Sequence, residues 1–255
     1  MGNLRISLGL AGRHLLLVRR IPSVFIPSLV MPLFILIATA GAFRGIAQLP
    51  DFKGAGYLAF TVPMAATMGA GFAGVNSGMT LARDLEGGFF DRLQATPASR
   101  IALLAGPLLA AVARSLFTTT VVYLAAMIGG VRFPGVVDTL VVYGLAAVFA
   151  SVASLWAIGI ALRAKSVQAS PLMQVVVFVS VFTSVAYTPR SALSGWLSHV
   201  ADWNPVTFIL EGSRDAQLFG VSWDKLGPAL LASAILFLLT ATFALRGLRR
   251  LDRNP

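Results

Sequence analysis

The 255-residue sequence contains no cysteine, which excludes a disulfide framework and a thiolate metal site. Charge is also scarce, since 12% of residues are charged and 57% are hydrophobic. Long stretches carry no Asp, Glu, Lys or Arg: 21–43, 54–82, 139–162, 166–189 and 226–245. The stretch 101–131 carries only Arg114. Each stretch is long enough for a helix to cross a hydrocarbon core of ~30 Å. We therefore predict an all-α membrane protein.

Two further absences exclude common chemistries. No G-x-x-x-x-G-K-[ST] phosphate loop occurs, so the chain cannot hydrolyse ATP by the P-loop route. The sequence GAGFAG at 69–74 matches the dinucleotide fingerprint, but it lies inside an uncharged stretch rather than in a strand-to-helix turn. We interpret it as part of a stripe of small residues that permits close helix packing. The stripe consists of Ala66, Ala70, Gly74 and Gly78.

The uncharged stretches predict a single transmembrane domain, 1–255, with six spans. The spans are expected at about 22–43, 55–82, 101–128, 137–161, 168–188 and 226–246. Residues 1–20 place apolar side chains on one helical stripe and are expected to form an interfacial helix. The connection 189–223 contains short amphipathic pieces, and we expect it to be a re-entrant helical segment on the external side.

The distribution of basic residues predicts the orientation. Thirteen of the 20 Lys and Arg residues fall in the two termini and in the connections that six spans place on the same side. The positive-inside rule therefore puts both termini in the cytoplasm. It also places His14 and His199 on opposite sides of the membrane, so they cannot share a metal ion. The net charge of +10 fits contact with anionic membrane lipids, and no compact basic domain indicates nucleic-acid binding.

Arg114 is the one charged residue expected in the middle of a span. An intramembrane arginine is costly and normally faces a partner or a wet cavity, yet no carboxylate lies in the interior of a predicted span to pair with it. Arg114 therefore either snorkels or binds backbone carbonyls, or it lines a polar path. Asn76 and Thr118 are the further candidates for such a path, although polar residues in spans usually just satisfy one another.

The segment 83–100, between spans two and three, is dense in charge. Gly87 and Gly88 are expected to break the preceding helix, and a short helix can then resume before Thr96-Pro97. On that helix Phe89 and Leu93 share a face with Phe90 alongside, which suits insertion into a groove on a cytosolic partner. The alternative is a solvated loop whose aromatic side chains touch the lipid headgroups.

The sequence D-L-E-G-G-F-F-D-R-L-Q-A-T-P-A-S-R resembles the signature of type-2 ATP-binding-cassette exporter permeases, especially the daunorubicin-type antibiotic-resistance branch. The matching positions are Asp84, Glu86, Gly88, Asp91, Arg92, Leu93, Pro97, Ser99 and Arg100. A second stretch, 203–220, resembles the Asn-Pro-x-Thr…Arg segment that precedes the last span of the same family. Asn204, Pro205, Thr207 and Arg214 match it, and Glu211 lies between them.

The resemblance implies a permease that is not itself an enzyme and binds no cofactor or metal. Two permeases, as a homodimer or with a related chain, would sit on two copies of a cytosolic ATPase that binds ATP and Mg²⁺. The protein would lie in the cytoplasmic membrane of a bacterium. The coupling helix, on which the ATPase presses, would lie within the segment 83–100. Its contact residues would be Asp84, Glu86, Gly88, Phe89, Phe90, Asp91, Arg92, Leu93 and Pro97.

The resemblance implies export as the function. Because the spans contain almost no charge, the cargo is expected to be amphipathic or lipophilic, such as drugs, antibiotics or lipids. The main alternative is a secondary transporter or channel that works without ATP. Ion-coupled carriers usually place an acidic residue in the middle of a span, and this sequence does not. An intramembrane enzyme is a third alternative, but no Ser–His or paired Asp arrangement lies in the spans.

Overall fold

The computed structural model describes residues 7, 9–13, 22–43, 45, 48, 56–89, 100–132 and 135–251. All regular elements within these ranges are helices, so the all-helical prediction is confirmed. The long helices are α2 (Pro22–Ala42), α3 (Tyr57–Glu86), α5 (Arg100–Ile128), α6 (Val136–Ala164) and α10 (Trp223–Leu251). The shorter ones are α7 (Ser170–Phe182), α8 (Trp196–Trp203), α9 (Pro205–Phe219) and the 3-10 turns η3 (Val167–Ala169) and η4 (Arg190–Ala192).

Four helices, α3, α5, α6 and α10, are long and apolar enough to cross a membrane, which makes the chain a multi-pass membrane protein. Two of the expected spans coincide with shorter apolar helices, Leu29–Ala42 and Val167–Phe182. The six-span layout therefore stays a prediction. Helix α7 ends at Phe182, and the chain continues through turns and bends. Helix α3 continues to Glu86, four residues into the segment assigned to coupling.

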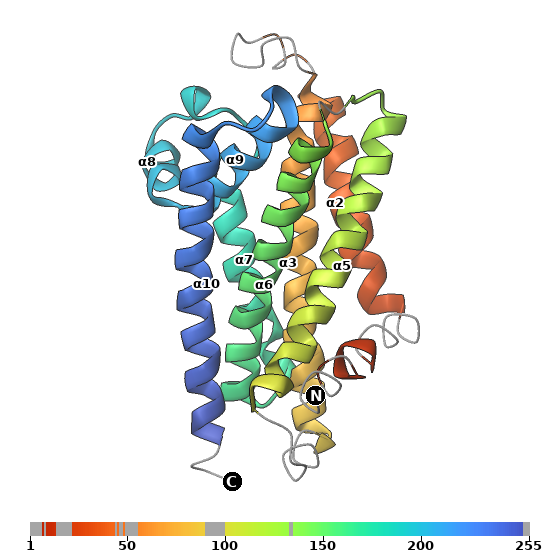
Figure 1. The fold of residues 1–255 in the computed structure, drawn as a ribbon, viewed down its shortest axis with the longest axis vertical. Coiled ribbons are helices and arrows are strands. Elements are labelled where there is room, and N and C mark those ends of the chain that lie inside the picture. Colours follow the sequence, from red (N-terminus) through yellow and green to blue (C-terminus); the bar gives the residue numbers. More distant parts are fainter. Residues whose placement is uncertain are drawn as a thin grey trace.

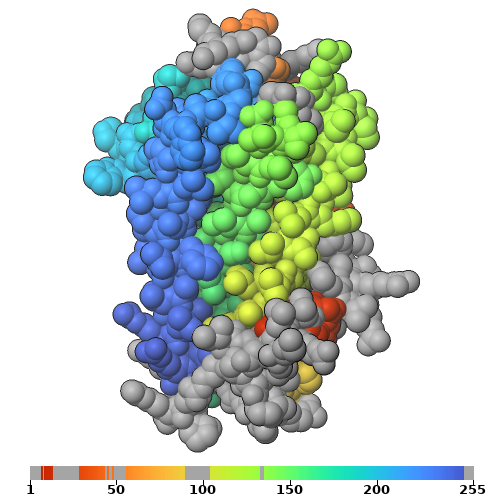
Figure 2. All heavy atoms as spheres, viewed as in Figure 1, coloured from red at the N-terminus to blue at the C-terminus, as the bar shows by residue number. Residues whose placement is uncertain are grey.

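Helix α3 lies at the centre of the bundle and packs against α2, α5, α6, α7 and α9 (Figure 1). Helices α3 and α6 are largely buried, whereas α10 is mostly exposed because it contacts only α6 and α9 extensively. Figure 2 shows α10, α6 and α5 side by side on one face. Exposed apolar side chains such as Leu231, Leu238, Phe117 and Leu124 on α10 and α5 suit contact with lipid.

The predicted stripe of small residues forms the contact between α3 and α6. A Cβ atom on Gly78 would lie 2.4 Å from the Ala157 Cβ, and one on Gly74 would lie 2.6 Å from the Ala150 carbonyl oxygen. Ala66 and Ala70, earlier in the stripe, are also buried. The two backbones thus approach as closely as they do because the side chains between them are absent or small. This packing interpretation is confirmed.

The two ends of the bundle differ in what they hold. Helices α8 and α9 lie at the upper end in Figure 1, where Trp196, Trp203 and Trp223 are all exposed. The lower end, here called the basal end, holds the described part of the N-terminal helix and the ends of α3, α6 and α10. The described N-terminal helix and the last turn of α10 therefore lie on one side of the bundle, as an even number of spans requires.

Candidate functional site

Helix α3 ends at the basal end on two glycines. The Gly87 N–H donates to the Arg83 carbonyl oxygen at 2.9 Å, and the Gly88 N–H donates to Leu85 at 3.2 Å. Gly88 then adopts φ +64°, a left-handed conformation that costs other residues roughly 1–2 kcal/mol. The helix break predicted at Gly87 and Gly88 is confirmed, and it sets the direction in which the chain leaves α3 at Phe89.

Asp84, in the last turn of α3, makes a bidentate ion pair. Its two carboxylate oxygens each accept a hydrogen bond of 2.7 Å from the two terminal nitrogens of Arg13 in the N-terminal helix. Asp84 is buried, with 8% of its surface exposed. Paired, charge-assisted hydrogen bonds of this kind are stronger and more directional than a single surface contact. Arg13 also lies over the Phe89 ring, 3.9 Å from its centroid.

Glu86, the last residue of α3, binds the connection between α6 and α7. Its Oε1 atom accepts a hydrogen bond from the Ser166 hydroxyl at 2.7 Å and another from the Val167 N–H at 2.8 Å. Ser166 is the N-cap of η3, so Glu86 fixes the start of that turn. The other predicted coupling residues lie outside the described residues: Phe90, Asp91, Arg92, Leu93 and Pro97.

Arg114, in the middle of α5, is buried in the interface with α3 and is 6% exposed. Its guanidinium donates to the Ser77 hydroxyl and, at 3.4 Å, to the Ala73 carbonyl oxygen. The Ser77 hydroxyl in turn donates to the Pro107 carbonyl oxygen at 3.0 Å. No carboxylate in the described ranges pairs with Arg114, and its Nε atom is buried without a partner. The sequence left open whether Arg114 snorkels or binds backbone carbonyls. In the structure it binds a backbone carbonyl and does not snorkel.

The other two pathway candidates are also buried. Asn76 is 8% exposed on α3, and Thr118, one turn along α5 from Arg114, is 1% exposed. A Cβ atom on Gly69 would lie 2.5 Å from the Thr118 methyl group, so Thr118 packs directly against α3. The structure therefore places Arg114 and Thr118 together in the α3–α5 interface.

Asn204 joins α9 to α7. Its side-chain oxygen caps α9 by accepting from the Val206 N–H at 2.9 Å, and Pro205 follows at the first helical position. Its side-chain amide donates to the Ser180 carbonyl oxygen at 2.6 Å and to the Thr183 hydroxyl at 3.1 Å. The Asn-Pro pair singled out in the sequence therefore fixes both the start and the position of α9.

Arg214 anchors the middle of α9 to the centre of the bundle. It is 7% exposed and donates to the Phe60 carbonyl oxygen of α3 at 3.2 Å. It also donates to the carbonyl oxygens of Val185 at 2.9 Å and Ala186 at 3.1 Å. The last two carbonyls are available because the chain has left α7 before reaching them. Arg214 thus satisfies two buried backbone acceptors that lie outside any helix.

Glu211 lies one turn from Arg214, in an ion-pair network near the surface. It accepts from Arg190 at 2.9 Å and from Lys225 at 3.2 Å. Arg190 also pairs with Asp202 of α8 at 3.0 Å. This network connects η4, α8, α9 and the start of α10, and its Arg190–Asp202 pair is largely exposed, so that pair contributes little to stability.

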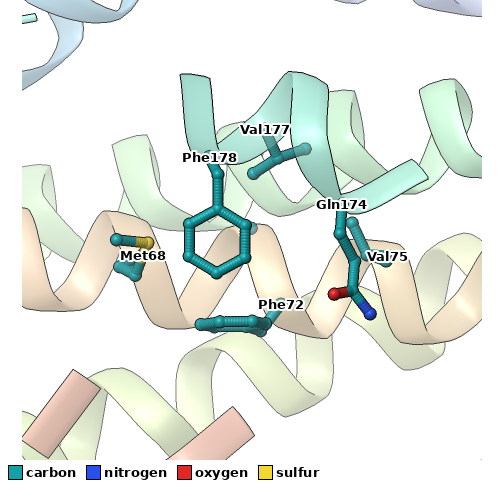
Figure 3. Close-up of a pocket in the computed structure, with 7 residues that line it drawn as sticks. Met68, Phe72, Val75, Gln174, Val177 and Phe178 are labelled. Atoms are coloured by element: carbon teal, nitrogen blue, oxygen red, sulfur yellow. The ribbon is translucent and has the colours of Figure 1, made fainter. Parts of the chain in front are cut away.

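A small recess lies between α3 and α7. Its walls are apolar except for the amide of Gln174, and its aromatic residues Phe72 and Phe178 meet edge to face at 5.2 Å between ring centroids (Figure 3). Its volume is about 10 Å³, enough for about one water molecule. A wider apolar groove of about 770 Å³ lies on the outer face of α7 beside α8, lined by Val176, Val179 and Trp203 among others.

Comparison with known proteins identifies the family of this chain. The profile of the family described as ABC-2 type transporter matches residues 8–218, which covers most of the chain. The protein belongs to the ABC-2 type transporter family. The match includes α2 to α9, and therefore both the basal end of α3 and the Asn204–Arg214 segment. The resemblance derived from the two sequence motifs is confirmed.

This ABC-2 transporter is also similar to the daunorubicin resistance ABC transporter permease protein DrrB1 of Streptomyces coeruleorubidus. The two sequences are 28% identical over 241 residues, which is 92% of this chain and 82% of the relative. The two proteins therefore correspond over most of their lengths.

The partners of the ABC-2 motif residues were not apparent from the sequence. Arg13 pairs with an acid 71 residues away, and Ser166 with one 80 residues away. Tyr123 likewise donates to Gln217, 94 residues away, at 2.7 Å. Helical periodicity relates residues three or four positions apart, so no local pattern indicates such pairs. Arg13 is one of four arginines in the expected interfacial helix 1–20, and the net positive charge was assigned to contact with anionic membrane lipids.

Proposed function

We propose that this permease forms the transmembrane part of an ATP-driven exporter of amphipathic or lipophilic cargo. Two copies, or one copy with a related chain, would assemble with two copies of a separate cytosolic ATPase that binds ATP and Mg²⁺. Membership of the ABC-2 family across residues 8–218 is the observation that carries this proposal. The missing phosphate loop supports it, because ATP-driven transport then requires a second protein.

The charge distribution supports the same assignment over an ion-coupled carrier. The acidic residues of the four long apolar helices lie only at their ends: Asp84, Glu86, Asp138 and Asp224. Asp138 is bound there by the Val221 N–H at 2.9 Å, and Asp84 by Arg13. A proton- or sodium-coupled carrier normally places its coupling carboxylate near the membrane midplane.

The orientation and location follow from the same charges. The excess of Lys and Arg at the basal end supports placing that end, with both termini, in the cytoplasm. The likeness to a daunorubicin resistance permease supports the cytoplasmic membrane of a bacterium and a drug or antibiotic as cargo. The ATPase would then act from the basal side, and cargo would leave at the α9 end.

The cargo path is proposed to follow α3 and α7. The recess with Phe72 and Phe178 offers two aromatic rings and one amide, which suits a planar apolar molecule with few polar groups. At about 10 Å³ it must widen before cargo can enter, so binding would require α3 and α7 to separate. Arg114, Asn76 and Thr118 would reach this path only after α5 moves relative to α3, because all three are buried.

The coupling segment provides the experiment. Phe90 and Leu93 would anchor in a groove on the ATPase, with Asp91 and Arg92 at the rim. Loss of a buried aromatic anchor commonly costs ~2 kcal/mol or more, whereas loss of a rim charge costs far less. Phe90→Ala should therefore reduce co-purification of the ATPase from membranes much more than Arg92→Ala does. Equal retention of the ATPase by both variants would contradict the coupling assignment.

A further inference from the structure

The N-terminal helix contacts both helices that enter and leave the segment 83–100. On the α3 side, Arg13 holds Asp84 through two hydrogen bonds of 2.7 Å and covers the Phe89 ring. On the α5 side, a Cβ atom on Gly106 would lie 2.5 Å from the Leu10 Cβ, so the two helices are in backbone-close contact. The N-terminal helix thus bridges the two ends of the segment.

A third connection runs from the same place to α6 and α7. Glu86, two residues after Asp84, holds the Ser166 hydroxyl and the Val167 N–H of the connection between those helices. Neighbouring acids on α3 therefore bind in two different directions. Asp84 binds the N-terminal helix, and Glu86 binds the turn that begins α7.

We propose that Arg13, Asp84 and Glu86 are positioning residues that brace the coupling segment within this chain. The brace makes α3, α5 and the N-terminal helix move as one body when residues 89 onward are pushed, and Glu86 passes the displacement to α7. The inference rests on the proposed function, because it presumes that an ATPase pushes on this segment. It reassigns Asp84 and Glu86, which serve internal contacts instead of the surface of the ATPase.

The brace is needed because the chain could otherwise bend at Gly88. Gly88 adopts a left-handed conformation with open space around it, so it fixes the chain direction but contributes no packing. A push on the next residues would bend the chain at Gly88 unless something opposed it. The Arg13 guanidinium opposes such bending, because it holds Asp84 before the glycines and Phe89 after them. A cation over an aromatic ring and a bidentate carboxylate contact are compatible uses of one planar guanidinium.

The test uses the full complex of permease and ATPase in proteoliposomes, with ATP hydrolysis and cargo transport measured together. Asp84→Asn should leave ATPase co-purification within about twofold of wild type but lower the cargo moved per ATP by about tenfold. The double variant Arg13→Asp with Asp84→Arg should recover a large part of that loss. Asp202→Asn, which removes an exposed ion pair at the α9 end, is the matched control and should match wild type.

A cysteine pair makes the test independent of whether Asp84→Asn folds. The chain has no cysteine, so Leu10→Cys with Gly106→Cys introduces the only thiols. Their Cβ atoms fall close enough for a disulfide after a small shift, whereas Gly12→Cys with Gly106→Cys should not cross-link, since open space surrounds Gly12. The cross-linked complex should move as much cargo per ATP as the wild type, because the N-terminal helix and α5 already move together.

Three results would overturn the brace. They are wild-type transport per ATP in Asp84→Asn, no cross-link between positions 10 and 106, and a cross-link that abolishes transport while the ATPase stays bound. Failure of the wild-type permease to bind any ATPase is a different result. It would overturn the proposed function, and the brace with it.

Discussion

The Arg214 guanidinium lies 3.5 Å from the centroid of the Phe60 ring and donates to the carbonyl oxygen of the same residue. One side chain of α9 therefore contacts both the ring and the backbone of one residue of α3. The same guanidinium holds two carbonyl oxygens of the chain that leaves α7. Arg214 thus determines how α3, α7 and α9 meet at the α9 end.

Arg214→Met should destabilise the permease by at least about 2 kcal/mol, because it leaves buried carbonyl acceptors without donors. Arg214→Lys should recover only part of this, since an ammonium group cannot reproduce the planar geometry. Arg246→Met, at an exposed position of α10, is the control and should change little. Thermal unfolding in detergent measures all three. Equal thermal midpoints for Arg214→Met and Arg246→Met would show that the Arg214 hydrogen bonds contribute nothing to stability.

Gly78→Ala should destabilise the contact between α3 and α6 by ~1–3 kcal/mol, because the added methyl group would lie 2.4 Å from the Ala157 Cβ and backbone must shift. Gly144→Ala on α6 meets nothing within 4 Å and should be neutral or stabilising by up to ~1 kcal/mol. Thermal unfolding should show a lowered midpoint for Gly78→Ala and an equal or raised midpoint for Gly144→Ala, although the two substitutions are chemically identical. A neutral Gly78→Ala would contradict the close-packed interface.

Arg114→Met should raise or preserve the thermal midpoint, because it replaces a buried charge whose Nε atom has no partner by a shorter, unbranched apolar side chain. If Arg114 serves the cargo path, the same change should lower transport about fivefold or more, a loss of function without loss of stability. Transport by proteoliposomes beside an unfolding curve measures both. Wild-type transport in Arg114→Met would remove Arg114 from the path.

Gly88→Val should impair ATPase-coupled transport through backbone strain alone. A side chain at position 88 has room, but valine does not readily adopt the φ of +64° that the backbone has there. Gly88→Asn should retain more activity, because asparagine tolerates the left-handed region. Gly87→Ala, at φ −81°, is the control on the neighbouring residue and should be mild. The order Asn above Val in transport per ATP is the expected result; the reverse order would exclude a backbone cause.

The membrane helices were predictable because their cause is local. The uncharged stretches 54–82 and 139–162 coincide with α3 and α6, and the four-residue spacing of Ala66 to Gly78 gave the face on which they pack. The end of α3 was predictable for the same reason, because two adjacent glycines disfavour a helix whatever surrounds them.

The roles of the polar residues were less predictable. Asp84 and Glu86 share a charged segment and a family motif, yet their partners, Arg13 and Ser166, come from distant parts of the chain. The early end of α7 at Phe182 was also missed, because the following residues are as uncharged as the helix itself. Hydropathy measures whether a stretch suits lipid, and it does not show where the chain leaves a helix and makes tertiary contacts such as those with Arg214.

ATP-dependent transport by defined components distinguishes an ATPase-driven exporter from an ion-coupled carrier. The purified permease would be placed in proteoliposomes with the cargo outside, with and without its cognate ATPase added on the same side as the cargo. Transport would be measured first with no ion gradient and then with an imposed proton or sodium gradient. The account predicts no ATP hydrolysis and no transport by the permease alone, and both activities when the ATPase and MgATP are added. Cargo movement by the permease alone, driven by an imposed proton or sodium gradient, would contradict it.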